Sequence, residues 1–420
     1  MIHFFTNCQI KNHIIEYMAT LFPKKQKQVV YKQAGEPEFR DNRHGCSKNR
    51  VVFADGVTEF VYKCARILIT QKTLFNPKPI CMKNKLSLFI LFLCLSSFGH
   101  LIAQNRIVDA YGNLSVKGNY IFSEHNDTVQ LRGMSLFWSQ WMPQYYNKDA
   151  VKWLRDDWKC TIVRAAMGVE KGGYLEHPDE EKQRVFDVVD AAIDLGMYVI
   201  IDYHSHEAHT EPDQAVAFFD EMAKKYGKYP NVLYEIYNEP LKEPTWSEDL
   251  KPYSEKVIKA IRKHDPDNII IVGTRQWSQL VDEAASDPIK GDNIAYTLHY
   301  YAASHGGWLR EEAEKAMAKG VCIFVSEYGT CDASGNGRFD PKKSDVWYQW
   351  MDKHHISYCN WSVADKEETA SILKPGASGK GGWKDADLTE SGKFVKADLV
   401  LKNTPILEKA NKSAKNKKKK

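Results

Sequence analysis

The chain has 420 residues, of which 43% are hydrophobic and 27% are charged. These proportions are ordinary for a folded protein, so they exclude an intrinsically disordered chain, a collagen-like chain and a protein with several membrane spans. The net charge of +4 is unevenly distributed, because segment 104–410 carries a net charge of −11 and the excess of basic over acidic residues lies at the two ends. Because segment 104–410 is acidic, it should repel a phosphate backbone, which argues against nucleic acid as a partner.

The first 103 residues contain a segment that is typical of secretion. Residues 82–103 begin with Met82 and two lysines and continue with the apolar run Leu86–Leu95, which is too short to span a bilayer. We therefore predict a signal peptide, cleaved after Ala103, and a secreted protein with no membrane attachment. Because a signal peptide must lead the chain, we interpret residues 1–81 as an extension upstream of the native start. The alternative is a small N-terminal domain followed by a buried or anchoring apolar segment.

Residues 104–405 show alternating patterns of strand and helix. Short apolar runs, several of them continuous as in strands buried on both faces, predict eight strands. These runs are Val129–Gly133, Thr161–Ala166, Tyr198–Tyr203, Val232–Asn238, Ile269–Gly273, Ile294–His299, Val321–Glu327 and Ile356–Trp361. Amphipathic segments between them, such as 184–195 and 253–262, predict helices. This alternation predicts an α/β fold, a (β/α)8 TIM barrel, as a single catalytic domain, with an open doubly wound sheet as the alternative.

Two further features bear on cofactors and on the chain end. No G-x-G-x-x-G motif follows the first strand and no P-loop is present, so we expect no nucleotide and no other cofactor. The cysteines of segment 104–405 have no zinc-ligand spacing, and we expect buried free thiols with one disulfide possible; they are Cys160, Cys322, Cys331 and Cys359. The lysine-rich segment 406–420 is predicted to be disordered.

Polar side chains collect where the predicted strands end, which is where the chemistry of such barrels is found. Glu239 follows the fourth strand and Glu327 ends the seventh. Two carboxylates facing each other across a barrel mouth suit glycoside hydrolysis, one donating a proton and the other attacking the anomeric carbon. On the same rim, a cation could keep the nucleophile ionised, an amide could hold a sugar 2-hydroxyl, and two further groups could orient the carboxylates; these are Arg164, Asn238, His299 and Tyr301. Each residue alone is equally compatible with an ordinary solvated loop, but the set is not.

Longer stretches carry a resemblance to a known family. They are Leu131–Ser135, Val151–Trp158, Val163–Met167, Val199–His204, Tyr234–Pro240, Asp265–Gly273, Leu298–Tyr301, Phe324–Thr330 and Leu373–Ser378. In order and spacing, over about residues 107–400, the chain resembles glycoside hydrolase family 5 of clan A, close to the bacterial endo-β-1,4-glucanases (cellulases). The resemblance implies a secreted, retaining endo-β-1,4-glucanase that acts on cellulose or related β-glucans by double displacement.

The resemblance also assigns roles to individual residues. It implies that Glu239 is the acid/base and Glu327 the nucleophile, supported by Arg164, His204, Asn238, His299 and Tyr301. Trp361 resembles the ring platform under the scissile sugar, and Trp141 resembles a further stacking residue. Lys366 and Glu368 resemble partners of the sugars on the non-reducing side. Trp277 resembles a platform on the leaving-group side, with plain packing as the alternative.

The chain departs from this family at two positions on the non-reducing side of the cleft. Close relatives carry a histidine near Phe137 and a tyrosine near Gly168. Phe137 keeps a flat face but loses a hydrogen-bond donor, and Gly168 removes a wall. The resemblance therefore covers the catalytic pair, whereas the contacts to the distal sugars are expected to differ from those of close relatives.

Other functions are compatible with parts of the pattern. His204 and His206, with His209, could ligate zinc in a metal-dependent hydrolase, but no lysine or aspartate lies in register to complete the site, and we expect no metal. A non-catalytic glycan-binding barrel would lack one of the two carboxylates, whereas both are present. Within the favoured class, mannan, xylan, lichenan or xyloglucan could replace cellulose. We expect a monomer whose partner is the polysaccharide.

Overall fold

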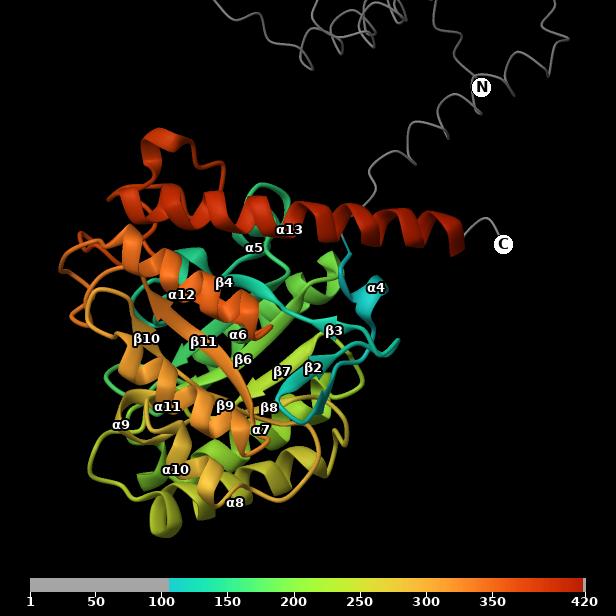
Figure 1. The fold of residues 1–420 in the computed structure, drawn as a ribbon, viewed down its shortest axis with the longest axis vertical. Helices are drawn as coiled ribbons and strands as arrows, with labels where there is room; N and C mark the ends of the chain where they lie inside the picture. Colours follow the sequence, from blue (N-terminus) through green and yellow to red (C-terminus); the bar gives the residue numbers. More distant parts are fainter. Residues whose placement is uncertain (1–105, 418–420) are drawn as a thin grey trace, which may run out of the picture. The chain divides into compact units, whose positions relative to one another are not determined.

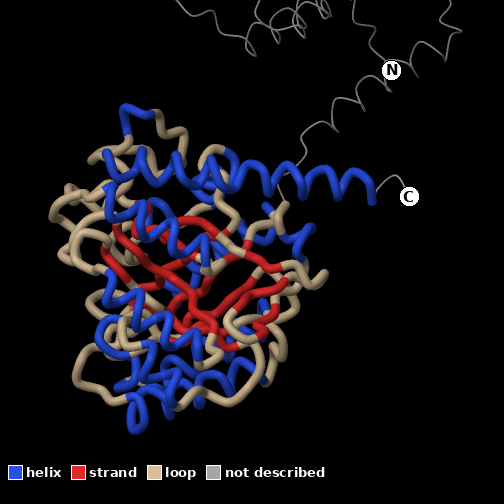
Figure 2. The backbone as a smooth tube through the Cα atoms, viewed as in Figure 1, coloured by secondary structure: helices blue, strands red, loops and turns tan. Residues whose placement is uncertain are grey.

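The computed structural model describes residues 106–417, with side chains through residue 412. The predicted extension 1–81 and signal peptide 82–103 lie outside the described residues. The central sheet has the strand order β10-β11-β12-β4-β5-β6-β7-β8-β9, and β9 also pairs with β11, which closes the sheet into a barrel. Figure 2 shows the strands at the centre with helices around them. This closed, all-parallel arrangement confirms the predicted (β/α)8 barrel and rules out the open sheet.

Eight strands form the barrel wall, and each predicted apolar run corresponds to one of them. They are β4 (Arg132–Leu136), β5 (Ile162–Gly168), β6 (Tyr198–His204), β7 (Val232–Glu235), β8 (Ile270–Val272), β9 (Ile294–Thr297), β11 (Cys322–Gly329) and β12 (Tyr358–Val363). Every residue of these strands is buried, as expected for a parallel sheet covered on both faces. A two-residue strand, β10 (Tyr300–Tyr301), pairs with the end of β11.

The first barrel strand begins three residues later than predicted. The apolar run from Val129 spans two elements, because Val129 belongs to β3 (Thr128–Val129) and pairs with Ile121 of β2. Together with β1 (Ser115–Lys117) and β2 (Tyr120–Phe122), β3 forms a small antiparallel sheet. Ile121 and Val129 pack in one cluster with Ile162, at the start of β5, so this small sheet covers the end of the barrel opposite the rim.

Helices surround the barrel wall (Figure 1). They are α5 (Lys148–Asp156), α6 (Pro178–Leu195), α7 (Pro212–Tyr226), α8 (Lys251–Arg262), α10 (Val281–Ser286), α11 (Gly307–Ala318), α12 (Pro341–Lys353) and α13 (Glu390–Lys417). Short elements join them: α4 (Val108–Tyr111), α9 (Arg275–Ser278), η1 (Pro143–Tyr145), η2 (Ala208–Thr210), η3 (Trp246–Leu250) and η4 (Asp385–Asp387). Within the described residues, no helix is long and apolar enough to cross a membrane. The four cysteines of this region are free and buried.

Helix α6 shows why these segments become helices. It begins at Pro178, has three acidic residues in its first turn and ends at Leu195, and the following Gly196 adopts a left-handed conformation (φ 68°). These are the features expected at helix termini, since acidic groups favour the positive end of the helix dipole and glycine adopts positive φ without strain. Val185, Val188 and Val189 are fully buried, as the 3.6-residue period predicts.

The prediction of disorder for segment 406–420 is wrong over most of its length. The helix α13 continues through this segment to Lys417 and runs along the side of the barrel beside α12 (Figure 1). Leu399, Asn403 and Leu407 follow a four-residue period and are buried, and the Asn403 Nδ2 donates hydrogen bonds to the carbonyl oxygens of Arg132 (3.2 Å) and Lys159 (2.9 Å). The prediction was wrong because it relied on the lysine-rich composition, which does not show that one narrow face of the helix is apolar.

The buried face of α13 predicts a measurable contribution to stability. Leu407 is 2% exposed, and Leu407→Ala is expected to lower the free energy of unfolding by about 2–5 kcal/mol, because it removes buried methyl groups and leaves a cavity. Leu401 in the same helix is 75% exposed, so Leu401→Ala is a matched control with an expected change within about 0.5 kcal/mol. Urea unfolding of both variants provides the comparison, and equal effects would mean that α13 does not dock as described.

Candidate active site

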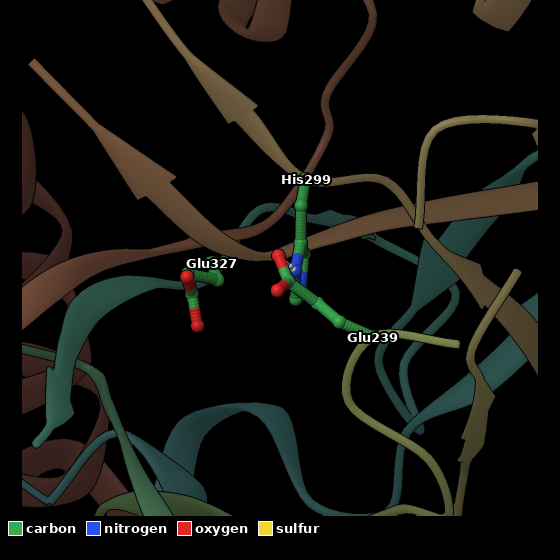
Figure 3. A group of neighbouring side chains, drawn as sticks. All are labelled: Glu239, His299 and Glu327. Carbon is green, nitrogen blue, oxygen red and sulfur yellow. Dashed lines mark hydrogen bonds and ion pairs between the residues drawn. The ribbon is translucent and has the colours of Figure 1, made fainter. Parts of the chain in front are cut away.

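The two carboxylates meet at the C-terminal rim of the barrel. Glu239 follows β7, and Glu327 lies within β11. Figure 3 shows both side chains directed toward the same space from different strands, with His299 next to Glu239. Glu239, His299 and Glu327 each offer one ligand atom, and these atoms lie within 4.8 Å of one another. The structure therefore brings together the residues that the sequence placed on three separate strands.

Glu327 is held by two donors. Arg164 Nη1 donates to Oε2 at 3.0 Å, and the Tyr301 hydroxyl donates to Oε1 at 2.9 Å. Burial and the nearby Glu239 raise the pKa of Glu327, while His299 and Arg164 act in the opposite direction. Arg164 thus favours the ionised form, as expected, but does not outweigh burial. A raised pKa fits a pair of close carboxyl groups that share a proton.

His299 links Glu239 to groups beneath the cleft. Its Nδ1 lies 2.9 Å from Glu239 Oε1, and its Nε2 lies 3.0 Å from the Ser326 hydroxyl oxygen. Ser326 in turn donates to Glu235 Oε1 at 2.7 Å. Burial lowers the pKa of His299, but its hydrogen bonds to Glu235 and Glu239 prevail and raise that pKa to about 9. The imidazolium then donates from both nitrogen atoms.

The protonation of His299 predicts pH-dependent stability. Its pKa rises from about 6.5 in the unfolded chain to about 9, so the stabilisation is fully present below pH 6.5 and is lost as the pH rises through 9. The difference in unfolding free energy between wild type and His299→Gln is expected to shrink by about 3 kcal/mol between pH 6 and pH 10. Urea unfolding at both pH values measures it. A constant difference would mean that His299 is neutral in the folded protein.

Arg164 lies at the centre of a network of buried charges beneath Glu239 and Glu327. Its fully buried guanidinium forms ion pairs with Asp202 (2.9 Å), Glu235 (2.7 Å) and Glu327 (3.0 Å). It also donates to Asn238 Oδ1 at 2.7 Å, which leaves the Asn238 Nδ2 without an acceptor among the described residues. Burial acts to raise the pKa of Glu235, but Arg164 and His299 hold it down to about 2. Asn238 is thereby oriented with a free donor.

His204 belongs to the same network. Its Nδ1 lies 2.7 Å from Asp202 Oδ2, and its ring stacks on Trp361 with centroids 5.1 Å apart. Burial and the charge of Arg164 hold the pKa of His204 well below its usual value, so the ring is neutral. A neutral ring that donates from Nδ1 offers Nε2 as an acceptor.

The sequence analysis did not single out Asp202, Glu235 or Ser326. All three lie within or next to apolar strand segments and are fully buried. These residues could have been found from the sequence, because each places a charged or hydroxyl group inside an apolar run. A buried charge requires a partner. The partner of the two acids is Arg164, and it comes within reach of Asp202 and Glu235 only in the closed barrel.

The tryptophans expected to be sugar platforms differ in exposure. Trp361 is mostly buried beside Phe137, with ring centroids 5.1 Å apart, whereas Trp141 and Trp277 are 49% and 41% exposed. A fourth indole, Trp138, was not singled out from the sequence; it contacts Trp141 and lies edge-on to His204, with centroids 4.9 and 4.1 Å away. Exposed flat rings beside a cleft suit the apolar faces of sugars.

The loop after β12 carries the two expected polar partners. Lys366 Nζ and Glu368 Oε2 are 2.5 Å apart and form an ion pair. Lys366 Nζ also lies 5.6 Å from the centre of the Phe137 ring. The structure therefore places Lys366 and Glu368 on the side of Phe137.

The local structure explains why position 168 is occupied by glycine. A Cβ atom at this position would overlap the side chain of Gln140, whose Nε2 donates to the Glu170 carbonyl oxygen at 3.1 Å. Ser139 Oγ accepts from the Gly168 N–H at 2.9 Å and is also hydrogen-bonded to the buried Glu181. Gln140 thus occupies the space that a larger residue at position 168 would need.

The three histidines of the alternative zinc site do not converge. His204 bonds to Asp202, the His206 Nδ1 lies 3.2 Å from the Glu239 carbonyl oxygen, and the His209 Nδ1 lies 2.8 Å from the Tyr237 hydroxyl. Among the described residues, the only cluster with metal-ligand spacing consists of Glu239, His299 and Glu327. The geometry therefore gives no support to zinc chemistry at His204-Ser-His206.

Known proteins are similar to this chain in sequence and in fold. The family model "Cellulase (glycosyl hydrolase family 5)" matches residues 122–367. The chain is 47% identical over 296 residues to an endoglucanase of Clostridium saccharobutylicum, covering 70% of this chain and 66% of the relative. It is 49% identical over 313 residues to Endoglucanase Z of Dickeya dadantii, covering 73% and 71%. A solved structure from Cytophaga hutchinsonii is 64% identical, with a TM-score of 0.72, and the match covers 72% of this chain and 99% of that one.

These matches cover the region that forms the barrel and its rim. The chain spans 66% and 71% of the length of the two endoglucanases. The matched segment 122–367 includes Glu239, Glu327 and the charged network around Arg164. The chain therefore belongs to the cellulases of glycosyl hydrolase family 5.

Proposed function

We propose that the protein is a secreted endo-β-1,4-glucanase that hydrolyses internal bonds of cellulose or a related β-glucan with retention of anomeric configuration. The observation that carries this proposal is the spacing of Glu239 and Glu327, which have ligand atoms within 4.8 Å. Retaining glycosidases hold their carboxyl groups about 5–5.5 Å apart, whereas inverting enzymes need about 6.5–9.5 Å to admit a water. The close spacing supports a covalent glycosyl-enzyme intermediate.

In the first step, Glu327 attacks the anomeric carbon while Glu239 donates a proton to the leaving oxygen. Arg164 and Tyr301 hold the two Glu327 oxygen atoms, at 3.0 and 2.9 Å, and so fix the direction of attack. In the second step, Glu239 takes a proton from water, the water oxygen bonds to the anomeric carbon, and the ester bond to Glu327 breaks. Arg164 and Tyr301 then stabilise the released carboxylate.

The groups around the pair favour a neutral sugar substrate. Asn238 has a free Nδ2 donor, because its Oδ1 is engaged by Arg164. This donor is suited to a sugar 2-hydroxyl, a contact that strengthens in the oxocarbenium-like transition state. Trp361 and Trp141 provide platforms on one side, and Trp277 provides one on the other. On this proposal Lys366 and Glu368 bind hydroxyl groups of the non-reducing-side sugars.

The endo mode and the cellulosic substrate rest on relatives named endoglucanases. Secretion rests on the signal-like segment 82–103. We further propose that the mature enzyme acts as a monomer.

A substrate panel tests the proposal. Carboxymethylcellulose, lichenan, xyloglucan and mannan are incubated with the enzyme, and reducing ends and viscosity are followed together. An endo enzyme lowers viscosity steeply at low reducing-sugar release, with carboxymethylcellulose expected to be a good substrate. Proton NMR of the first products is expected to show the β-anomer. Fastest release from mannan would reassign the substrate, and an α-anomer would exclude retention.

A further inference from the structure

Glu181 is a buried carboxylate that lies outside the site described above. It belongs to the first turn of α6 and is fully buried, whereas Glu180 in the same turn is exposed. A buried carboxylate is costly unless it is paired and hydrogen-bonded. Glu181 has two such partners, because it forms an ion pair with Arg184 and its Oε2 accepts a hydrogen bond from the hydroxyl of Ser139. Neither Glu181 nor Arg184 has a role in the mechanism proposed above.

Ser139 connects Glu181 to the end of β5. The residue is fully buried in the loop that follows β4. Its hydroxyl donates to Glu181 and accepts from the Gly168 N–H at 2.9 Å, and its own N–H donates to the Ala166 carbonyl oxygen at 3.1 Å. Because a hydroxyl group donates and accepts at once, this one side chain joins the loop both to α6 and to a barrel strand.

Ser139 lies between the two indoles of the loop 137–142, which we call the platform loop. Trp138 lies edge-on to His204, with centroids 4.1 Å apart, and Trp141 lies against Trp138 and is 49% exposed. The Trp141 N–H donates to the Trp138 carbonyl oxygen at 3.1 Å, so the two residues close one turn around Ser139. The position of Ser139 therefore fixes the position of both rings.

The platform loop has a second attachment at Phe137. The Tyr146 hydroxyl lies 2.7 Å from the Phe137 carbonyl oxygen and 2.8 Å from that of Ala166. Tyr146 thus holds the start of the loop, whereas Ser139 and Glu181 hold the part that carries the indoles. A binding surface that is fixed in advance loses less conformational entropy when a ligand arrives, so such attachments strengthen binding.

We propose that Glu181 is a positioning residue for the indole pair Trp138 and Trp141, which it holds through Ser139 in the orientation that binds sugars on the non-reducing side. This inference rests on the proposed function, in which Trp141 is a sugar platform. Glu181 is fully buried and cannot touch the substrate itself. Its removal is therefore expected to weaken substrate binding without slowing bond cleavage, which separates KM from kcat.

Hydrolysis of cellohexaose by the purified enzyme tests this role. Glu181→Ala removes the attachment, and KM is expected to rise about 3–10-fold while kcat changes less than about twofold. Glu181→Gln keeps an oxygen atom that can accept from Ser139, so KM is expected to stay within about twofold of wild type. The unfolding midpoint of each variant is measured, and the assays are run well below the lowest of them.

Glu180→Ala is the matched control. Glu180 lies in the same turn, with its Oε2 3.6 Å from Arg184 Nη2, but its side chain is 69% exposed. This variant is expected to leave KM and kcat unchanged. Ser139→Ala removes the other end of the attachment, so Ser139→Ala combined with Glu181→Ala is expected to have the KM of Ser139→Ala alone, within about twofold.

The outcomes separate the inference from the proposed function. Absence of cellohexaose hydrolysis by wild type would overturn the proposed function itself. With an active wild type, an unchanged KM in Glu181→Ala would overturn the inference even if the unfolding midpoint falls, and so would a loss confined to kcat. If Glu181→Ala does not fold, Ser139→Ala decides, because a raised KM supports the inference and an unchanged KM overturns it. Multiplied effects in the double variant would show that Glu181 does not act through Ser139.

Discussion

Replacing Glu327 with alanine is expected to abolish hydrolysis of soluble β-glucan, with at least a ~10³-fold loss, while the barrel stays folded. The loss is large because no other group at the site can form the covalent intermediate. The fold is expected to persist because Arg164 keeps its ion pairs to Asp202 and Glu235 when Glu327 is removed. Reducing-sugar release and thermal unfolding of the purified variant measure the two effects.

Azide provides a chemical check on the role of Glu327. In Glu327→Ala, azide can enter the space of the missing carboxylate and attack an activated cellobioside from the same face, giving the α-glycosyl azide. Glu243→Ala is the matched control, since Glu243 is exposed in the loop after β7, and it is expected to behave as wild type. Residual activity above ~1% of wild type would exclude Glu327 as the nucleophile.

Replacing Glu239 is expected to cause a loss that depends on the leaving group. With β-glucan, Glu239→Gln is expected to reduce kcat/KM by about 10²–10⁴-fold, because the sugar oxygen then departs without a proton. With 2,4-dinitrophenyl β-cellobioside, formation of the intermediate is expected to proceed nearly as in wild type, because dinitrophenolate leaves without protonation. The initial burst of phenol and the slower steady state are followed by stopped-flow absorbance.

Glutamine at position 239 keeps the shape of the side chain and an oxygen atom that can accept a hydrogen bond from His299, so the comparison reports on proton transfer. Azide is expected to accelerate the steady state of Glu239→Gln and to yield the β-glycosyl azide, because it replaces water in the second step. Equal losses on β-glucan and on the activated substrate would assign the proton donor to another residue. His206 would then be the next candidate, since its Nδ1 lies 3.8 Å from Glu239 Oε2.

The buried charges explain why the rim residues keep their geometry. Arg164 alone contacts three carboxylates, and breaking such a buried network leaves uncompensated charge. His299 adds a second connection, through Ser326 to Glu235. The two proposed catalytic carboxylates are therefore fixed by one shared set of buried partners, which limits their freedom to separate.

The C-terminal helix α13 was only partly predicted from the sequence. Segment 406–420 was predicted to be disordered from its lysines, but Leu407 and Ala410 are buried and extend α13. A helix needs only a narrow apolar stripe to dock, and composition averaged over the segment hides that stripe. The first barrel strand was misplaced for a related reason, since one apolar run from Val129 serves two different sheets.

The alternation of buried strands and amphipathic helices can be read from the amino-acid sequence, and it predicts the barrel and the rim on which Glu239 and Glu327 lie. These features are local, because continuous apolar runs and helical periodicity can be recognised from residues that are neighbours in the sequence. The buried groups that surround the two carboxylates could not be predicted in this way, because they depend on how the strands come together. Arg164, Asp202 and Glu235 come from different strands, and Glu181 of α6 meets Ser139 of the loop after β4, because closure of the sheet brings distant residues together.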